Sequence, residues 1–414
     1  MRRLNATAGW TLLGYGGVGA LMSCAGAAHA ALFATDFVTG SVPGTWQQDR
    51  YPPAVFAPGS TLAGRSDVLD IGVTAADSAV NRPSNYVGAF YNTQGRGLEL
   101  NLPGYAVVYG SFYIPQAWAT SSGPTQNRRA DLWAEASPAT GSDSCSASGC
   151  NFFPIVGFSN ADKTSQTTAG GTGRYRVFDG TAGWSELDSI PVKYDDWSDV
   201  CIAFTGNSLV SYVNGAPVYT QTNMQHNDVG TLGPTTHISR VIMQVYNFGG
   251  DYTDHWSGLG AGQLGSLGVS AGSGQSTPVG SSFSAPLSVL VKDTDGAPLP
   301  CVPVTFEVPA SNASATLDKI TVVTNRAGLA SVQAMANTIA GDYAVTASAP
   351  GQQAPVSFAL KNAAPPPPPP PAPPASPTPV PALDGGGLLL TSAGIAAAMA
   401  YLARRRRSIR AEAP

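Results

Sequence analysis

The sequence predicts an all-β protein that contains two β-sandwich domains. Its 414 residues include 47 glycines and 34 prolines, and only 12% of them are charged, a composition that is poor in helix formers. Short segments of alternating apolar and polar residues recur between turns rich in Gly, Pro, Asn and Asp, which is the pattern of half-buried strands. The net charge of −4 gives no basic surface for nucleic acid, so that class of partner is excluded.

The clearest pattern is a β-hairpin within residues 195–219. Val200, Ile202 and Phe204 alternate with small or polar residues, so one face of the first strand is apolar. The second strand ends at Asn214-Gly215, the dipeptide that best accepts the positive φ angles of a type I′ turn. This hairpin predicts a strand pair inside a larger sheet.

The first domain is expected over residues 31–262, and it contains no segment with helical periodicity. Trp197 and Tyr212 are expected between its two stacked sheets, because large aromatic rings suit a sandwich interior. The strands expected in this domain are 32–37, 68–73, 86–91, 98–102, 106–114, 130–136, 152–158, 175–178, 200–205, 209–213 and 238–246.

Three segments of this domain carry a family resemblance. DDWSDVCIAFTGNSLVSYVNGAPV, with RYRVFDGTAGW before it and VIMQVYNFGGDYTDHW after it, resembles the strand-hairpin region of concanavalin A-like, laminin-G-like jelly rolls. The resemblance covers about residues 32–261 and implies a jelly-roll sandwich. It does not by itself imply an activity, because function depends on the site that a fold carries.

A second, smaller domain is expected over residues 266–362. The turn DTDGAP at 293–298, the strand VPVTFEV at 302–308, the corner TNRAGLA at 324–330 and the strand AGDYAVTASA at 340–349 resemble bacterial Ig-like (Big-type) domains of surface proteins. About a hundred residues is the usual length of such a sandwich. No Cys…Trp…Cys core is present, so the resemblance implies a spacer-type domain.

The C-terminal part combines a proline-rich stalk with a candidate sorting segment. Residues 363–381 are expected to form a stiff polyproline II spacer of about 50 Å. Residues 385–403 carry no charge, and a helix of this length just crosses a bilayer core. The arginine cluster that follows is expected to stay cytoplasmic. With VPAL at 380–383, residues 382–414 resemble PEP-CTERM and IPTL-CTERM sorting signals, which implies cleavage near Pro381; a permanent tail anchor is the alternative.

Residues 1–30 have the pattern of a signal peptide. Two arginines precede a long uncharged segment, and Ala28-His29-Ala30 has the small-x-small pattern of a cleavage site. We expect cleavage after Ala30. The segment LMSC resembles a bacterial lipobox, so lipidation of Cys24 is the alternative, and both routes predict export.

Export would place four further cysteines in an oxidising compartment. Cys145 and Cys150 lie in one Ser/Gly-rich loop, so we expect them to form a disulfide. Cys201 and Cys301 belong to different predicted domains, and we expect both thiols to stay unpaired.

Two loops have the composition of a sugar-binding site, in which aromatic rings stack on sugar faces and amide side chains bind hydroxyls. The candidate ligand residues are Tyr91, Asn92 and Gln94 in the first loop and Tyr246, Asn247 and Tyr252 in the second. The alternative is that both are plain turns. Trp118, Trp133, Trp184 and Trp197 are interpreted as core or sheet-face residues.

No catalytic residues are predicted. The E-x-D-x-E strand that glycanases of this shape typically carry is absent, and so are H-x-x-x-H and G-x-S-x-G patterns. The nearest carboxylate pairs are Asp131 with Glu135, Glu186 with Asp188, and Asp251 with Asp254. Asp131 and Glu135 can share a strand face, with Trp133 between them.

A structural Ca²⁺ is the one possible cofactor, since jelly rolls of this kind often join their first and last strands with a hard cation. Asp36 and Asp254 are its candidate ligands. The favoured alternative is that Asp36 ends a strand and Asp254 faces water.

The sequence as a whole predicts an exported, non-enzymatic protein of the surface or extracellular matrix of a Gram-negative bacterium. Its expected role is to bind glycan or to serve in structure and adhesion. The expected partners are extracellular polysaccharide or surface glycans, the export and sorting machinery, and the membrane before processing. The alternative is a polysaccharide-processing hydrolase or lyase of jelly-roll fold.

Overall fold

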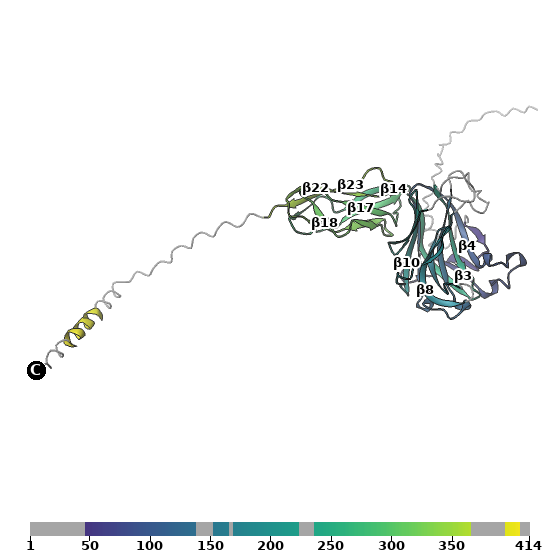
Figure 1. Cartoon of the computed structure of the whole chain (residues 1–414), viewed down its shortest axis with the longest axis horizontal. Coiled ribbons are helices and arrows are strands. Elements are labelled where there is room, and N and C mark those ends of the chain that lie inside the picture. Colours follow the sequence, from purple (N-terminus) through teal and green to yellow (C-terminus); the bar gives the residue numbers. More distant parts are fainter. Residues whose placement is uncertain (1–45, 138–151, 165–168, 223–235, 366–393, 406–414) are drawn as a thin grey trace, which may run out of the picture. The chain divides into compact units, whose positions relative to one another are not determined.

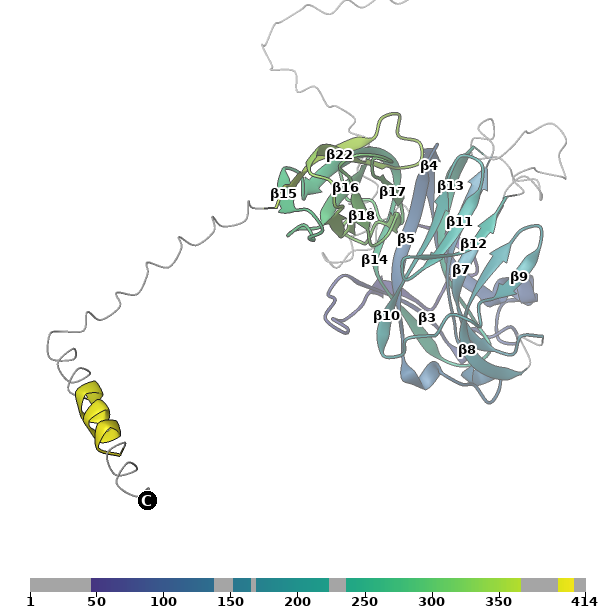
Figure 2. The same ribbon diagram turned by 60° about the vertical axis from the view of Figure 1, so that its left-hand side comes forward.

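A computed structural model describes residues 46–137, 152–164, 169–222, 236–365 and 394–405. The chain divides into two compact units, residues 1–364 and residues 365–414. In the first unit the described residues form two β-sandwiches (Figures 1 and 2). In the second unit residues 394–405 are helical. Among the described ranges, no helix combines the length and the apolar character needed to span a membrane.

Several predicted features lie outside the described residues and stay predictions. They are the signal peptide with Cys24 and Ala30, the strand at 32–37 with Asp36, the Cys145–Cys150 disulfide, the processing site at Pro381, and residues 385–393 of the predicted membrane segment.

The larger sandwich has one sheet of seven antiparallel strands. Their order is β1 (Gln47–Arg50), β4 (Thr93–Pro103), β13 (His237–Tyr246), β6 (Arg129–Ser137), β7 (Ile155–Ala161), β8 (Gly170–Asp179) and β9 (Gly183–Glu186). The predicted strands at 98–102, 130–136, 175–178 and 238–246 fall on strands of this sheet, and the one at 152–158 overlaps β7 from Ile155 onward.

The opposing sheet contains nine strands, seven of which belong to the larger sandwich. These are β12 (Ala216–Gln221), β11 (Leu209–Val213), β10 (Asp196–Phe204), β5 (Ala106–Ile114), β14 (Tyr252–Ala271), β3 (Val68–Val73) and β2 (Val55–Pro58). The predicted hairpin is the β10–β11–β12 region. Asn214 and Gly215 have φ angles of 50° and 79°, which confirms the predicted turn with positive φ at both positions.

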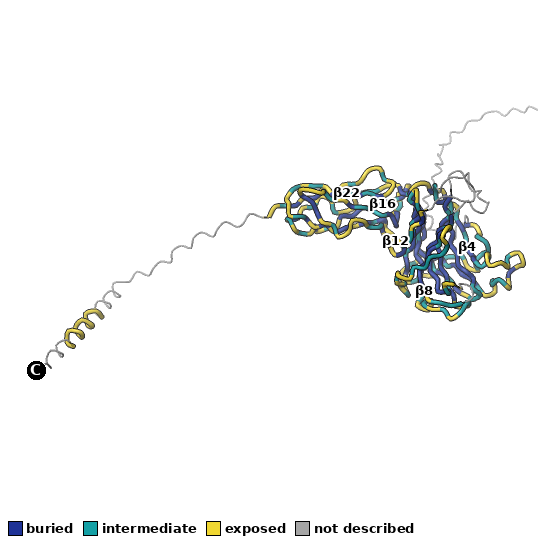
Figure 3. The backbone as a smooth tube through the Cα atoms, viewed as in Figure 1, coloured by how far each residue is buried: buried dark blue, intermediate teal, exposed yellow. Residues whose placement is uncertain are grey.

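The core of the larger sandwich lies between the two sheets, where Figure 3 shows mostly buried backbone. Val200, Ile202 and Phe204 point into it, as predicted, together with Phe112 and Trp256. Trp197 and Tyr212 do not. They are buried on the other face of the nine-stranded sheet, because residues on a strand alternate between faces and these two are out of phase with the core positions.

The prediction of a strand at 86–91 is wrong. This segment forms two short 3₁₀ turns, η2 (Ser84–Tyr86) and η3 (Ala89–Asn92). Pro83 and Gly88 precede the two turns, and the rings of Tyr86 and Tyr91 pack edge to face at 5.1 Å between centroids. The aromatic residues that suggested a strand therefore pack on one another within a loop.

Strand β14 belongs to both sandwiches. Its first part pairs with β3 and β5, and residues 264–271 pair with β16 (Leu287–Asp293) of the smaller sandwich. The boundary expected between residues 262 and 266 falls inside this strand. The other strands of the smaller sandwich are β15 (Gln275–Pro278), β17 (Pro303–Glu307), β18 (Ala315–Leu317), β19 (Thr321–Val323), β20 (Leu329–Val332), β21 (Ala334–Ala336), β22 (Gly341–Ser348) and β23 (Val356–Ala363).

The two sandwiches also share a hydrophobic cluster and a covalent link. Tyr105 and Tyr212, on the outer face of the nine-stranded sheet, are buried with the core residues of the smaller sandwich. Cys201 on β10 forms a disulfide with Cys301, with 6.4 Å between their Cα atoms. The prediction that both thiols stay unpaired is wrong, because the shared strand β14 brings the loop that carries Cys301 against β10.

Candidate ligand-binding face

The outer face of the seven-stranded sheet carries an unusual set of polar side chains. On β6 the residues Ala130, Leu132 and Ala134 belong to the core. Arg129, Asp131, Trp133 and Glu135 alternate with them and so lie on the opposite face. The predicted sharing of one face by Asp131 and Glu135, with Trp133 between them, is therefore confirmed.

The strand register continues this set across the sheet. Gln244 on β13 is paired with Asp131, Asp131 with Gly157 on β7, Gly157 with Arg176 on β8, and Arg176 with Glu186 on β9. Directly paired residues lie on the same face of a sheet. A polar row therefore crosses five strands on the face that does not pack against the core.

Asp131 is the centre of an ion network in this row. Its Oδ2 atom lies 2.5 Å from Arg129 Nε and 3.2 Å from Arg176 Nη2, and the side chain is 2% exposed. Burial raises the pKa of the Asp131 carboxyl to about 6, against the opposing effect of the Arg129 charge. Nearby, Arg174 Nε lies 2.5 Å from Glu186 Oε2. The network is a fixed framework, because its charges are paired and shielded from water.

Two glycines make room for this framework. A Cβ atom on Gly157 would lie 2.2 Å from the Ala130 carbonyl oxygen and 2.3 Å from Asp131 Oδ1. A Cβ atom on Gly97 would lie 2.2 Å from Arg240 Nε. The side chains of Asp131 and Arg240 therefore extend over the backbones of neighbouring strands.

Aromatic rings cover the framework at one end. The guanidinium carbons of Arg176 and Arg129 lie 3.8 and 4.6 Å from the centre of the Trp184 ring, distances typical of cation–π contacts. Trp133, with Ile155 and Ile242, forms a small buried cluster against which Trp184 packs. The interpretation of Trp133 and Trp184 as sheet-face residues agrees with these positions.

At the other end, Arg50 connects the sheet to the loop before β4. Its guanidinium carbon lies 4.9 Å from the Trp133 ring centre and 4.6 Å from that of Phe90, and Phe90 is 62% exposed. We call the connected set Phe90, Arg50, Trp133, Asp131, Arg129, Arg176 and Trp184 the aromatic–arginine band.

The structure brings the two predicted ligand loops together beside this band. The Asn247 amide nitrogen donates a 2.7 Å hydrogen bond to the Asn92 carbonyl. Asn92 Nδ2 donates to the Tyr246 hydroxyl at 3.4 Å, and Asn247 Nδ2 donates to Gln94 Oε1 at 3.5 Å.

Most of the predicted ligand residues are nevertheless structural. Gln94, Asn247 and Tyr252 are buried, and the Tyr252 hydroxyl donates to the Tyr246 carbonyl at 2.6 Å. Burial raises the pKa of the Tyr252 phenol well above its ordinary value. Only Tyr91 and Asn92 are half-buried in the loop next to Phe90.

Asp254 is fully buried, so the expectation that it faces water is wrong. It lies on β14 between the core residues Tyr252 and Trp256, and neither carboxyl oxygen has a hydrogen-bond partner within the described ranges. Burial, reinforced by the Asp131 charge, raises its pKa well above the ordinary value. Asp36 lies outside the described residues, and within those residues no three His, Cys, Asp or Glu side chains are grouped so as to hold a metal ion.

The remaining carboxylates have local partners. Asp188 lies 2.5 Å from Lys163 Nζ, and both side chains are more than half exposed. Asp251 accepts a hydrogen bond from the Ala75 amide. Asp188 lines a surface pocket together with Asp162, Lys163 and Arg174, so basic side chains lie beside these two carboxylates.

Sequence reasoning missed Arg50, Arg129 and Arg176. The signal for Arg129 was present in the run R-A-D-L-W-A-E at 129–135, where large polar or aromatic residues alternate with small apolar ones. Such alternation places the large residues together on the face away from the core.

Comparison with known proteins identifies the smaller sandwich. Residues 281–360 match the Bacterial Ig-like domain (group 1) family. These residues are therefore similar to a bacterial Ig-like domain, and we refer to the smaller sandwich as the Ig-like domain. The family resemblance stated from the sequence motifs is thereby confirmed for these residues. No curated protein sequence matches the chain.

Similarities among solved structures are distant. A protein titled "Sialidase" shows 11% identity and a TM-score of 0.30, with 53% of this chain and 17% of that one covered. The PL7 alginate lyase AlyA1 from Zobellia galactanivorans shows 10% identity and a TM-score of 0.31, with 53% and 96% covered. The catalytic domain of a laminarinase from Thermotoga petrophila shows 10% identity and a TM-score of 0.30, with 55% and 93% covered. All three TM-scores are below 0.5, so we base no argument on them.

Proposed function

We propose that this protein binds glycan through the aromatic–arginine band, as an exported component of the cell surface or extracellular matrix. The observation that carries the proposal is the composition of the outer face of the seven-stranded sheet. Phe90 and the half-buried Trp184 supply rings that can stack on sugar faces, Arg50 beside Phe90 can bind hydroxyls, and the buried Trp133 and Asp131 network hold these groups in place.

The other sheet of the larger sandwich is less suited to this role. Its outer face contributes Tyr105, Val107 and Tyr212 to the cluster shared with the Ig-like domain. Among the residues that the structure describes, none from the seven-stranded sheet belongs to that cluster. A ligand as long as a polysaccharide is therefore more easily accommodated on the seven-stranded side.

Export is supported by the Cys201–Cys301 disulfide, because stable disulfides form in oxidising compartments and are rare in the cytosol. The Ig-like domain is consistent with a surface protein, since its Big-type resemblance implies a spacer.

We propose binding without turnover. Asp131 has the raised pKa that a catalytic acid or base often shows, but it is buried beneath two arginines and a tryptophan. The alternative of a polysaccharide-processing enzyme predicts new reducing ends or unsaturated sugar ends when the purified protein is incubated with a glycan that it binds.

The test is affinity electrophoresis of the purified protein against a panel of bacterial and algal polysaccharides. Phe90→Ala and Trp184→Ala should each weaken binding at least tenfold, since aromatic residues dominate binding at such surfaces. Tyr113→Ala is the matched control, because Tyr113 is a half-buried aromatic residue on the nine-stranded sheet, where it packs on Trp197. Equal retardation of all variants, or no retardation by any polysaccharide, would contradict the proposal. Tyr252→Ala is a poor test, because it removes a buried side chain.

A further inference from the structure

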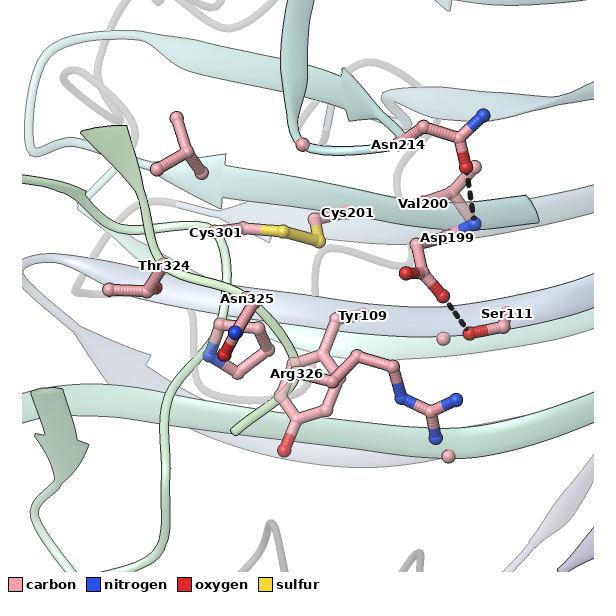
Figure 4. A pocket seen from close by; sticks show the side chains of 15 residues that line it. Tyr109, Ser111, Asp199, Val200, Cys201, Asn214, Cys301, Thr324, Asn325 and Arg326 are labelled. Carbon is pink, nitrogen blue, oxygen red and sulfur yellow. Dashed lines mark hydrogen bonds between the residues drawn. A yellow bond between two sulfur atoms is a disulfide. The ribbon is translucent and has the colours of Figure 1, made fainter. Parts of the chain in front are cut away.

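A pocket lies where the two sandwiches of the first unit meet, well apart in sequence from the aromatic–arginine band. It has a volume of about 260 Å³, and both cysteines of the Cys201–Cys301 disulfide line it. Tyr109 and Ser111 of β5 and Asp199 of β10 line one side, and Asn325 and Arg326 of the Ig-like domain line the other (Figure 4).

The carboxylates around this pocket already have partners. Asp67 accepts hydrogen bonds of 2.8 Å from the Ser257 hydroxyl and the Gly258 amide. Asp199 accepts a hydrogen bond from Ser111 and lies 3.7 Å from Arg65 Nη2. Arg65 in turn lies over the Trp197 ring at 4.5 Å.

Arg326 is the arginine of the pocket lining, its side chain is exposed, and it forms no ion pair within the described part of the chain. Its guanidinium extends over Gly258, where a Cβ atom would lie 1.6 Å from Nη2. Burial lowers the pKa of Arg65, and the positive charge of Arg326 lowers it further, so the two guanidinium groups are close enough to repel each other. An anion bound at Arg326 would relieve that repulsion.

Two asparagines supply free donors to the pocket, whereas the Ser111 and Thr324 hydroxyls already donate to Asp199 and to the Leu299 carbonyl. Asn214 Oδ1 accepts from the Asp199 amide, and Asn325 Oδ1 accepts from the Ala327 and Leu329 amides. The side-chain nitrogens of both asparagines have no partner in the described part of the chain. Tyr109 contributes an aromatic ring that lies against Gly260. Free donors, one unpaired arginine and a ring fit a ligand that presents a carboxylate and several hydroxyl oxygens.

We infer that this junction pocket binds a single sugar acid, a hexuronate unit, with its carboxylate on Arg326. The volume lies slightly below the ~300 Å³ at which typical ligand pockets begin, so one ring fits better than an oligosaccharide. Because both sandwiches contribute walls, the site exists only when the Ig-like domain is seated against β5 and β10.

The inference is tested by isothermal titration of the oxidised full-length protein with D-glucuronate and D-galacturonate. D-glucose supplies the ring without the carboxylate, and acetate supplies the carboxylate without the ring. At least one uronate should bind saturably and at least tenfold more tightly than either control compound. Failure of both uronates to bind, or equal affinity for glucose or acetate, would overturn the assignment.

Variants separate this pocket from other sites. Arg326→Gln should weaken uronate binding at least tenfold, whereas Lys361→Gln, which removes an exposed cation from the same domain, should leave it unchanged. Trp184→Ala should also leave it unchanged, which distinguishes this pocket from the aromatic–arginine band. Loss of uronate binding in Trp184→Ala with full binding in Arg326→Gln would place the ligand on the sheet face and refute the inference.

Discussion

Removal of the Cys201–Cys301 disulfide should destabilise the protein strongly. The bond closes a loop between residues 100 apart in sequence. In the chain-entropy model, such a cross-link lowers the entropy of the unfolded chain by an amount worth about 4.7 kcal/mol at 25 °C. That value is an upper estimate, since engineered and natural disulfides typically contribute about 2–4 kcal/mol.

The assay is urea unfolding of the wild-type protein, with and without reductant, and of the double variant Cys201→Ala/Cys301→Ala. Both thiols are buried, so the alanines also leave small cavities. Reduced wild-type protein retains both sulfur atoms and therefore isolates the effect of the cross-link. We expect the reduced protein to lose about 2–5 kcal/mol of unfolding free energy, and the variant to lose slightly more.

Two results would refute this reasoning. One is a free-thiol assay that finds Cys201 and Cys301 reactive in the unfolded, unreduced protein. The other is a variant whose unfolding free energy lies within about 0.5 kcal/mol of the oxidised wild type, a difference typical of neutral surface substitutions.

Three further predictions concern the larger sandwich and its binding face. A carboxyl whose folded-state pKa is raised stabilises the fold fully below its unfolded pKa of about 3.9 and loses that contribution as the pH rises toward the folded pKa. Asp254→Asn should therefore be more stable than wild type at pH 8, with a smaller difference at pH 4. Identical pH profiles of the two proteins in urea unfolding would contradict this prediction. Gly157→Ala should cost about 1–3 kcal/mol through overpacking, because the added Cβ would meet the Ala130 carbonyl oxygen and Asp131. Gly268→Ala, which meets nothing within 4 Å, should change thermal stability little. Equal melting temperatures of the two variants would contradict the overpacking argument. Phe90→Ala should weaken glycan binding without lowering the melting temperature, because Phe90 is 62% exposed, and a large loss of stability would make it a structural residue.

Local patterns in the sequence predicted much of the fold. Strands β3, β5 and β11 have the predicted bounds, because each is a run of apolar or alternating residues flanked by turn formers. The Asn325 corner was also predictable, since its side chain accepts from the Ala327 and Leu329 amides and Gly328 has a φ of 70°. Such features depend on residues near one another in sequence.

Strand β14 was missed because its sequence argues against a strand. It contains five glycines among 20 residues, and glycine weakens strand propensity. The structure explains why glycine is needed at two of these positions. Gly260 lies under the Tyr109 ring, and a Cβ atom on Gly265 would lie 2.3 Å from the Asp293 carbonyl oxygen. The neighbouring strand β5 requires Gly260 and the close approach of the second sandwich requires Gly265, and sequence pattern alone reveals neither contact.

In the candidate site too, local sequence patterns predicted some residues, whereas others depend on contacts between distant parts of the chain. Trp133 and its face were predictable from alternation along β6. The contacts of Arg50 with Phe90 and Trp133 depend on a loop meeting a distant strand, which no local pattern encodes. Asp254 was expected to face water because aspartate is seldom fully buried, yet it lies in the core between Tyr252 and Trp256.

The shared strand β14 makes the two sandwiches interdependent when the chain is cut. A fragment ending near residue 262 would expose Tyr105, Val107 and Tyr212, which are buried only together with Ig-like residues, and would leave Cys201 as an unpaired thiol. A fragment starting there would keep the β14 residues that pair with β16, but it would lose the Tyr105 and Tyr212 contacts of the shared cluster and leave Cys301 as an unpaired thiol. Each sandwich therefore buries apolar residues and pairs a cysteine of the other. The smallest fragment of this chain that we expect to fold without exposing them contains both sandwiches.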